Sequence, residues 1–350
     1  MCNTNFNLER LVRPNVWKMK PYSSARDEFK QFEKEMIFLD ANENPFETSF
    51  NRYPDPQQRM LKRWFSKLKN ISENQILLGN GSDEVLDLLF RAFCEPGKDA
   101  ILTLPPTYGM YAVLAALNAI ENREVLLDKD FQPQTDEILK SIDENTKIIF
   151  LCSPNNPTGN LISMAKILKL LTHFNGLVVI DEAYIDFASQ ESWISKLQEF
   201  PNLIIVQTLS KAYGMAGIRL GICYASTEII SILNKIKPPY NVNQLTQKEA
   251  IKNLSDTNKI KTDISSLAIE KNRLFKGLVQ IKFITKMYQS DANFILIKVD
   301  NAALRYSQLL EKGIVVRNRS TQPLCANSLR ITVGTPVENR RLIATLKELK

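Results

Sequence analysis

Histidine is almost absent from this chain, since His173 is the single one among 350 residues. A histidine-dependent catalytic triad or a multi-histidine metal site therefore cannot be built within one chain. His173 lies in the segment LLTHFNG, where Asn175 and Gly176 are typical of a helix C-terminus. A histidine in the last turn interacts favourably with the helix dipole, so we interpret His173 as structural.

Cysteine is scarce and long apolar runs are absent. The five cysteines are odd in number and contain no CxxC pair, which argues against a disulfide framework or a thiolate metal cluster: Cys2, Cys94, Cys152, Cys223 and Cys325. No stretch approaches a membrane span in length, and the first 17 residues lack the apolar core of a signal peptide. We expect a cytoplasmic protein with no metal and no membrane contact.

The composition is that of a soluble globular protein, with 44% apolar and 24% charged residues, and the length predicts two domains. The net charge is +7, but the basic residues are spread along the chain rather than gathered in blocks. We interpret this charge as a solvated basic surface and expect no nucleic acid partner. An anionic small substrate would also benefit from a positive field near its site.

Strand and helix patterns alternate between residues 56 and 224. Residues 56–69 and 82–93 are predicted to be helices, the second with Ser82 as its N-cap. Near-continuous apolar runs indicate strands covered on both faces, in the segments QILLG, DAILTL, REVLLD, TKIIFLC, GLVVID, NLIIVQTL and LGICYA. Such alternation predicts a mostly parallel sheet in an α/β domain.

The pattern changes after Cys223. The segment PPYNVNQ, residues 238–244, interrupts the chain, and a helix-rich charged region follows to about residue 280. Three later strand patterns and a closing helix predict a smaller α+β domain.

Polar motifs follow four of the predicted strands. These motifs are GNGSDE, CSPNNPTGN, DEAYIDF and TLSK. Because ligands bind at the carboxyl ends of strands in doubly wound sheets, we expect the four motifs to converge on one edge.

The order NPTG, DEAY and SK followed by an arginine resembles the class II pyridoxal-phosphate (PLP) aminotransferases of fold type I. The similarity is greatest to the histidinol-phosphate aminotransferase family, through LDANENP, NRYPDPQ, RAFCEPGKDAIL, PPTYGMY, CSPNNPTG, DEAYIDF, TLSKAYGMAGIRLG and LRITVGT. The resemblance implies a large domain with a seven-stranded sheet at 39–243 and a small domain at 244–350. It also implies an N-terminal arm at 1–38 that packs with the small domain.

The resemblance assigns the central chemistry to two residues. Lys211 resembles the Schiff-base lysine, which moves a proton between the substrate's α-carbon and the cofactor. Asp181 is similar to the aspartate that keeps the pyridine nitrogen protonated, so that the ring becomes an electron sink. Taken alone, Lys211 would be interpreted as an exposed lysine at a strand end, and Asp181 as the cap of a turn.

Three further residues match positions around the cofactor ring. Tyr184 and Asn156 correspond to groups that hydrogen-bond the 3′-oxygen, and Tyr108 to the aromatic residue that stacks on the ring. Tyr108 also fits a simple core position at the start of a helix.

The phosphate end of the cofactor is predicted from hydroxyls, a guanidinium and a helix N-terminus. Thr208, Ser210 and Arg219 supply side-chain donors, and we expect the backbone N–H groups of Ser82 and Asp83 to hold the phosphate at the helix N-terminus.

One conflict arises there, because Asp83 and Glu84 bring negative charge close to a dianion. The sequence predicts either that Arg219 offsets this charge or that the carboxylates point away.

The resemblance also extends to substrate binding and assembly. Tyr53 matches a tyrosine that reaches the cofactor phosphate of the neighbouring subunit, which implies a homodimer. Arg330 resembles the arginine that holds the anionic group of the substrate. Arg317 and Tyr22 match positions of phosphate recognition, and Asn42 matches a position that lines the site. We interpret Arg319 as a solvated loop arginine.

The leading hypothesis is an aminotransferase that moves an amino group between L-histidinol phosphate and 2-oxoglutarate, by a ping-pong mechanism in histidine synthesis. An aromatic amino-acid aminotransferase and a decarboxylase similar to threonine-phosphate decarboxylase remain alternatives. A DNA-binding regulator on the same scaffold would need a further domain ahead of it. The matching motifs begin near residue 20, which leaves no room for one.

Overall fold

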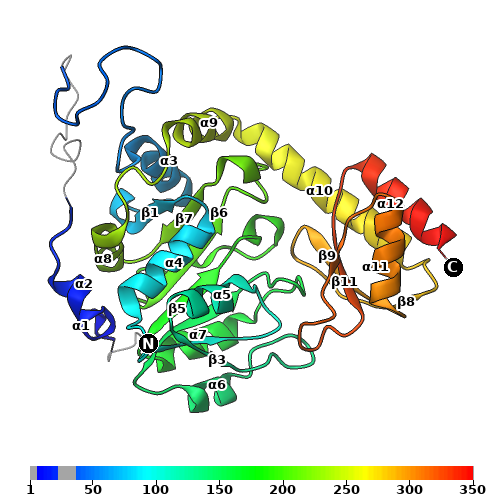
Figure 1. Ribbon diagram of the computed structural model, residues 1–350. Helices are drawn as coiled ribbons and strands as arrows, with labels where there is room; N and C mark the ends of the chain where they lie inside the picture. The colour runs from blue at the N-terminus through cyan, green and yellow to red at the C-terminus, as the bar shows by residue number, and fades with distance from the viewer. Residues whose placement is uncertain (1–5, 23–36, 350) are drawn as a thin grey trace.

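The computed structural model describes residues 6–22 and 37–349, so Cys2 and residues 23–36 of the predicted N-terminal arm lie outside the described residues. Figure 1 shows a large domain built around one sheet and a smaller domain at the C-terminal end, joined along a long helix. Within the described ranges, no helix is both long and apolar enough to cross a membrane.

The large domain contains a seven-stranded sheet in the order β1-β7-β6-β5-β4-β2-β3. Its strands are β1 (Ile76–Gly79), β2 (Ala100–Thr103), β3 (Glu121–Glu124), β4 (Thr146–Cys152), β5 (Leu177–Asp181), β6 (Leu203–Thr208) and β7 (Gly221–Tyr224). β7 pairs antiparallel with both β1 and β6, and the remaining pairs are parallel. The expected mostly parallel α/β sheet is confirmed.

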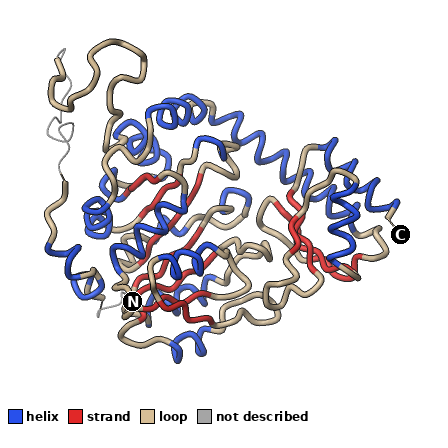
Figure 2. The backbone as a smooth tube through the Cα atoms, in the orientation of Figure 1, coloured by secondary structure: helices blue, strands red, loops and turns tan. Residues whose placement is uncertain are grey.

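Helices cover both faces of this sheet, as the two layers around the strands in Figure 2 show. They are α3 (Arg59–Lys69), α4 (Ser82–Phe93), α5 (Met110–Leu117), α6 (Thr135–Ser141), α7 (Met164–His173), α8 (Thr227–Ile236) and α9 (Gln244–Leu254). Along β4, Ile149 and Leu151 pack toward α3 and α7, while Ile148 and Phe150 pack toward α4, α5 and α8. Successive residues of a strand point to opposite faces, so burial of both faces requires the unbroken apolar run seen in the sequence.

Two local predictions were wrong. Ser82 is the first residue of α4 rather than its N-cap, because Gly81 occupies the cap position with a φ of 85°, which glycine adopts without strain. The strand predicted in REVLLD lies earlier, at β3 (Glu121–Glu124), whose side chains are exposed or half-buried. An edge strand need not be apolar, so the apolar run does not mark its position.

The N-terminal arm also differs from the expectation. Its described helices, α1 (Leu8–Leu11) and α2 (Pro14–Lys18), pack on α4 and α8 of the large domain through the buried Val12 and Val16. Arg13 strengthens this docking by an ion pair of 3.2 Å with Glu95. The apolar face of α2 therefore directs the described part of the arm to the large domain rather than to the small one.

The small domain holds an antiparallel sheet in the order β10-β11-β9-β8. Its elements are α10 (Thr257–Leu278), β8 (Ile284–Met287), β9 (Phe294–Val299), α11 (Ala302–Glu311), β10 (Arg317–Asn318), β11 (Ser328–Thr332) and α12 (Pro336–Glu348).

The boundary between the domains comes later than the sequence predicted. Ala250 and Leu254 of α9 are buried in the core of the large domain, and Ile260 packs against the same core. Leu274, further along α10, belongs to the core of the small domain. The change of domain therefore occurs within α10.

Candidate active site

A pocket of about 150 Å³ lies at the carboxyl edge of the large sheet. Its walls come from the ends of β4, β5 and β6, from the start of α4 and from the loop before α5. It is lined by Ser82, Asp83, Tyr108, Cys152, Asn156, Asp181, Ala183, Tyr184, Thr208, Ser210, Lys211, Ala216 and Arg219. The structure thus brings together ten of the residues that the sequence analysis assigned to a cofactor, as the parallel strands required.

Asp181 is the last residue of β5 and is only 4% exposed. Its Oδ2 accepts a hydrogen bond of 2.8 Å from the Tyr111 hydroxyl, and its Oδ1 accepts one of 3.0 Å from the Ala183 backbone N–H. Burial raises the pKa of Asp181 to about 6, although both hydrogen bonds and Lys211 act in the opposite direction. A cation in the pocket would therefore find a carboxylate already oriented toward it.

Lys211 lies in the loop after β6, and its Nζ is 5.8 Å from the centroid of the Tyr184 ring. Partial burial, with a further contribution from the Arg330 guanidinium, lowers the pKa of Lys211. A lysine with a lowered pKa is a better nucleophile and proton carrier at neutral pH.

The other end of the pocket carries hydrogen-bond donors. The Thr208 hydroxyl donates to the Ser210 hydroxyl at 3.0 Å. Arg219, in the loop before β7, lines the same pocket. Gly81 leaves room for this guanidinium, because a Cβ atom on Gly81 would lie 2.6 Å from Nη2 of Arg219. A Cβ on Gly221 would overlap the backbone at Gly81 and Ser82. The two glycines let the N-terminus of α4 approach the pocket.

The two carboxylates at the start of α4 are accommodated in different ways, one by its orientation and the other by the nearby Arg219. Glu84 turns away and accepts hydrogen bonds from the Asn80 backbone N–H and from Asn241 Nδ2. Asp83 faces the pocket, where it accepts a hydrogen bond of 3.1 Å from the Tyr108 hydroxyl and lies 3.9 Å from Arg219 Nη2.

The small domain contacts the lining of the pocket through Arg330 of β11. Its Nη1 donates to Oδ1 of Asn156 at 2.5 Å, and its guanidinium carbon lies 5.1 Å from the centroid of the Phe294 ring. Tyr184 of the large domain packs edge-on against Phe294, which belongs to β9 of the small domain. Arg330 therefore stands at the junction of the two domains, beside Asn156 and Tyr184.

The other two arginines lie on the same hairpin. Arg317 is exposed and pairs with Arg330 in the register of β10 and β11. Arg319 is half-buried and its Nε has no hydrogen-bond partner in the structure. The interpretation of Arg319 as a solvated loop residue was therefore wrong.

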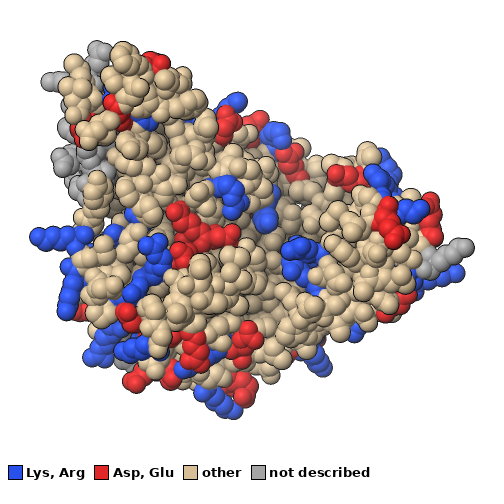
Figure 3. All heavy atoms as spheres, in the orientation of Figure 1, with Lys and Arg blue, Asp and Glu red and all other residues tan. Residues whose placement is uncertain are grey.

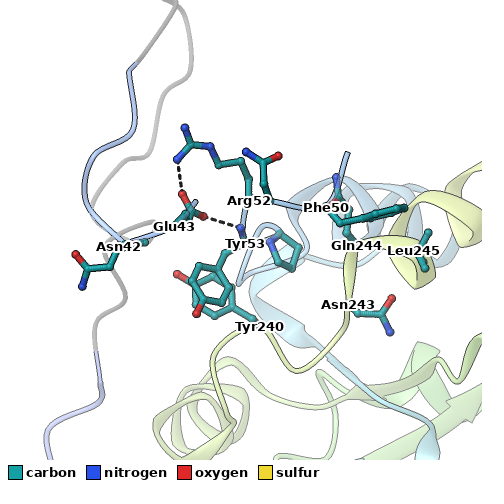
Figure 4. Close-up of a pocket in the computed structure, with 12 residues that line it drawn as sticks. Asn42, Glu43, Phe50, Arg52, Tyr53, Tyr240, Asn243, Gln244 and Leu245 are labelled. Atoms are coloured by element: carbon teal, nitrogen blue, oxygen red, sulfur yellow. Dashed lines mark hydrogen bonds and ion pairs between the residues drawn. The ribbon is translucent and has the colours of Figure 1, made fainter. Parts of the chain in front are cut away.

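Three predicted residues line other pockets. Asn42 and Tyr53 belong to an open pocket with Tyr240 and the start of α9, and Tyr22 lies beside α3 and α8. Figure 4 shows the Tyr53 ring stacked on Tyr240, at a centroid distance of 4.5 Å, and Glu43 bonded to Arg52 and to the Tyr53 backbone. Within one chain, none of these three side chains is part of the pocket around Lys211.

Sequence reasoning missed Tyr111, which is completely buried and donates to Asp181. A signal was present, because Tyr108 and Tyr111 are three residues apart, the spacing that places two side chains on one face of a helix. Their rings meet edge-on at 5.6 Å.

The family model for aminotransferase class I and II matches residues 25–346 of the chain. The chain belongs to the aminotransferase class I and II family. Its members depend on PLP, and the chain carries that family's motifs over nearly its whole length.

Comparison with individual aminotransferases shows which members of this family the chain is similar to. The histidinol-phosphate aminotransferase of Flavobacterium johnsoniae is 64% identical over 345 residues, which are 98% of this chain and 99% of that protein. The crystal structure of the histidinol-phosphate aminotransferase from Clostridium acetobutylicum matches with a TM-score of 0.79 at 26% identity, over 86% of this chain and 91% of that chain. The chain is thus a member of the histidinol-phosphate aminotransferase family.

A complex of the Sinorhizobium meliloti histidinol-phosphate aminotransferase with pyridoxal-5'-phosphate has the same fold. It matches with a TM-score of 0.78 at 24% identity, over 85% of this chain and 82% of that chain.

The pocket fits PLP on its own chemistry. The hydroxyls, the guanidinium and the first residues of α4 line one pocket, which is the set of donors that a phosphate requires, and a Cβ on Gly81 would collide with the Arg219 guanidinium. At the other end, the buried carboxylate of Asp181 suits a protonated ring nitrogen. Lys211 lies in the same pocket wall and supplies the amine that an aldehyde needs.

Removal of the Tyr111 hydroxyl tests whether its hydrogen bond stabilises the ionised form of Asp181. Tyr111→Phe takes away a donor that stabilises the charged form of Asp181, so the pKa of Asp181 should rise above its value of about 6. PLP affinity depends on ionised Asp181, so the pH below which affinity falls should rise by about 0.5 to 1 unit. PLP titrations of the apoprotein across pH would measure this.

Tyr306→Phe, on α11 in the small domain, serves as the matched control and should leave the profile unchanged. Identical profiles for Tyr111→Phe and the wild type would show that the hydrogen bond does not influence Asp181.

Proposed function

We propose that this chain transfers an amino group between L-histidinol phosphate and 2-oxoglutarate, a step of histidine biosynthesis, with PLP bound in the pocket around Lys211. The observation that carries the proposal is the placement of Lys211, Asp181 and Arg330 around one pocket in a chain so similar to histidinol-phosphate aminotransferases. One substrate leaves as a ketone before the other enters, so both use the same pocket in turn.

The cofactor is held by groups that the large domain positions. Thr208, Ser210, Arg219 and the backbone N–H groups of Ser82 and Asp83 bind its phosphate. PLP, when bound, supplies an aldehyde that takes up the amino group and a ring that withdraws electrons from the carbon losing its proton.

Four side chains of the large domain control the reactivity of the ring. The Asp181 carboxylate would keep the ring nitrogen protonated, and Tyr108, in the same pocket wall, would stack on the ring. Asn156 and Tyr184, which line the same pocket, would donate hydrogen bonds to the 3′-oxygen.

Lys211 performs the proton transfer. With PLP bound, its Nζ would take the proton from the substrate's α-carbon as a general base and deliver it, as a general acid, to the carbon that was the aldehyde carbon of the cofactor. The lowered pKa of Lys211 favours the neutral amine that must accept this proton.

Substrate anions are bound by the small domain. Arg330 is held in place by Asn156 and presents a planar guanidinium that suits a carboxylate or a phosphate. Arg317 stands opposite Arg330 in the hairpin and contacts the phosphate of histidinol phosphate. Because glutamate carries two carboxylates and histidinol phosphate carries none, the same cations must serve both.

The alternative substrates and a nucleic-acid-binding function have less support in this chain. The high identity to a histidinol-phosphate aminotransferase over both full lengths favours that substrate over an aromatic amino acid or threonine phosphate. On the face shown in Figure 3, basic and acidic side chains are interspersed, so this face presents no basic band of the kind that binds nucleic acid. The buried free cysteines Cys94, Cys152, Cys223 and Cys325 suit a reducing cytoplasm.

A homodimer completes the active unit in our proposal. The segment around Tyr53 carries large apolar side chains that are more than half exposed, namely Ile37, Leu39, Phe46, Phe50 and Tyr53 itself. A second copy would cover this surface. Tyr53 and Asn42 lie away from the pocket of their own chain, so they would contribute to the partner's site.

A half-reaction screen tests the substrate. The absorption of bound PLP should change on addition of histidinol phosphate or glutamate and remain constant with phenylalanine. Lys211→Ala should retain no pyridoxyl group after borohydride reduction and dialysis, because its covalent anchor is missing.

Release of carbon dioxide from O-phospho-L-threonine without amine transfer would establish the decarboxylase instead. A reduced pyridoxyl adduct that survives in Lys211→Ala would move the anchor to another lysine.

Complementation between two inactive variants tests the shared site. If Tyr53 acts on the partner's site, a mixture of Lys211→Ala and Tyr53→Ala chains forms heterodimers in which one of the two sites is intact. Random assembly should then restore roughly one quarter of the wild-type activity. Activity no greater than that of the separate variants, despite proven exchange of subunits, would place Tyr53 in its own chain's site or outside both.

A further inference from the structure

Three arginines share one face of the β10–β11 hairpin. In the antiparallel register, Arg317 lies opposite Arg330, and the Arg319 backbone N–H donates to the Ser328 carbonyl at 2.8 Å. Because side chains alternate along a strand, Arg317 and Arg319 lie on the same side of the hairpin, with Asn318 on the other. Arg330 faces Asn156 and Tyr184, so Arg319 is directed to the same region of the pocket.

Arg319 has no anionic partner in this position. Among the residues that the structure describes, no carboxylate lies within ion-pair distance of Arg317, Arg319 or Arg330. The Nε atoms of Arg319 and Arg330 are both buried without a hydrogen-bond partner. Two adjacent guanidiniums with unsatisfied buried donors are unfavourable unless an anion binds between them.

The electrostatic surroundings of Arg319 support this view. Burial and the neighbouring Arg330 and Arg317 lower the pKa of Arg319, and the opposing contributions come from Tyr184 and Cys325. Both of those groups have raised pKa values and are neutral at physiological pH. The positive charge of the hairpin is therefore not neutralised by the protein around it.

We propose that Arg319 determines substrate specificity by binding the phosphate group of the amino donor together with Arg317 and Arg330. This inference rests on the proposed function and deepens it. A phosphate dianion offers three oxygens to guanidiniums on one face, whereas a carboxylate occupies the fork of a single arginine. Arg319 therefore contributes more to the binding of histidinol phosphate than to that of glutamate.

The experiment compares three donors that differ at the anionic group: histidinol phosphate, L-histidinol, which lacks the phosphate, and glutamate. Arg319→Gln keeps the polar chain and removes the charge. It should lower kcat/KM for histidinol phosphate by roughly tenfold or more, and for the other two donors by less than about threefold. Arg319→Lys restores the charge without the planar fork and should recover part of the loss.

Arg63→Gln is the matched control, because Arg63 is 63% exposed on α3 and its removal should change none of the ratios. Equal losses with all three donors, or no loss with histidinol phosphate, would overturn the inference. If Arg319→Gln does not fold, the same comparison is made with Arg319→Lys alone. Its loss should then remain larger for histidinol phosphate than for histidinol.

The two proposals fail in different ways. A wild-type protein that does not react with histidinol phosphate contradicts the proposed function. Competitive inhibition by inorganic phosphate, weakened in Arg319→Gln, would still support the anion site in that case. Unchanged inhibition would contradict it.

Discussion

The active-site architecture depends on one buried carboxylate at the end of a central strand. Asp181 ends β5 between β4 and β6, and the chain places polar groups there only because parallel strands expose their carboxyl ends at one edge. Burial makes the free carboxylate unfavourable and raises the pKa of Asp181 to about 6, while Tyr111 and the Ala183 N–H hold it in one orientation. This energetic cost is offset when a cation binds, so the pocket is prepared for a protonated ring.

The two domains divide the chemistry between them. The large domain carries the groups assigned to the cofactor, and its tight glycine turns bring the α4 N-terminus to the pocket. The small domain brings cations on a short hairpin, and the hydrogen bond from Arg330 to Asn156 connects the two. Glutamate and histidinol phosphate differ in their anionic groups but use the same cofactor, so in our proposal the arginines of the small domain recognise the substrates and the large domain holds the cofactor.

Much of this arrangement could be predicted from the sequence, because the strands and the motifs that follow them are visible as short patterns of neighbouring residues. The apolar runs of β4, β5 and β6 predicted the sheet, and the sheet predicted that NPTG, DEAY and TLSK would meet. Features that depend on contacts distant in the chain were not predictable. Tyr111 is an ordinary helix residue until the fold brings its hydroxyl to Asp181, 70 positions away. Arg319 was misjudged because its burial results from packing around the hairpin, and the domain change was placed too early because α9 joins the large core.

The protonation state of the bound ring tests the central role of Asp181 most directly. Nitrogen-15 NMR of the protein loaded with PLP labelled at the pyridine nitrogen would measure it near neutral pH. Our account predicts a protonated nitrogen in the wild type and an unprotonated one in Asp181→Asn, whose neutral amide cannot balance a pyridinium. A protonated nitrogen in both proteins, or in neither, would contradict the claim that this carboxylate controls the chemistry of the site.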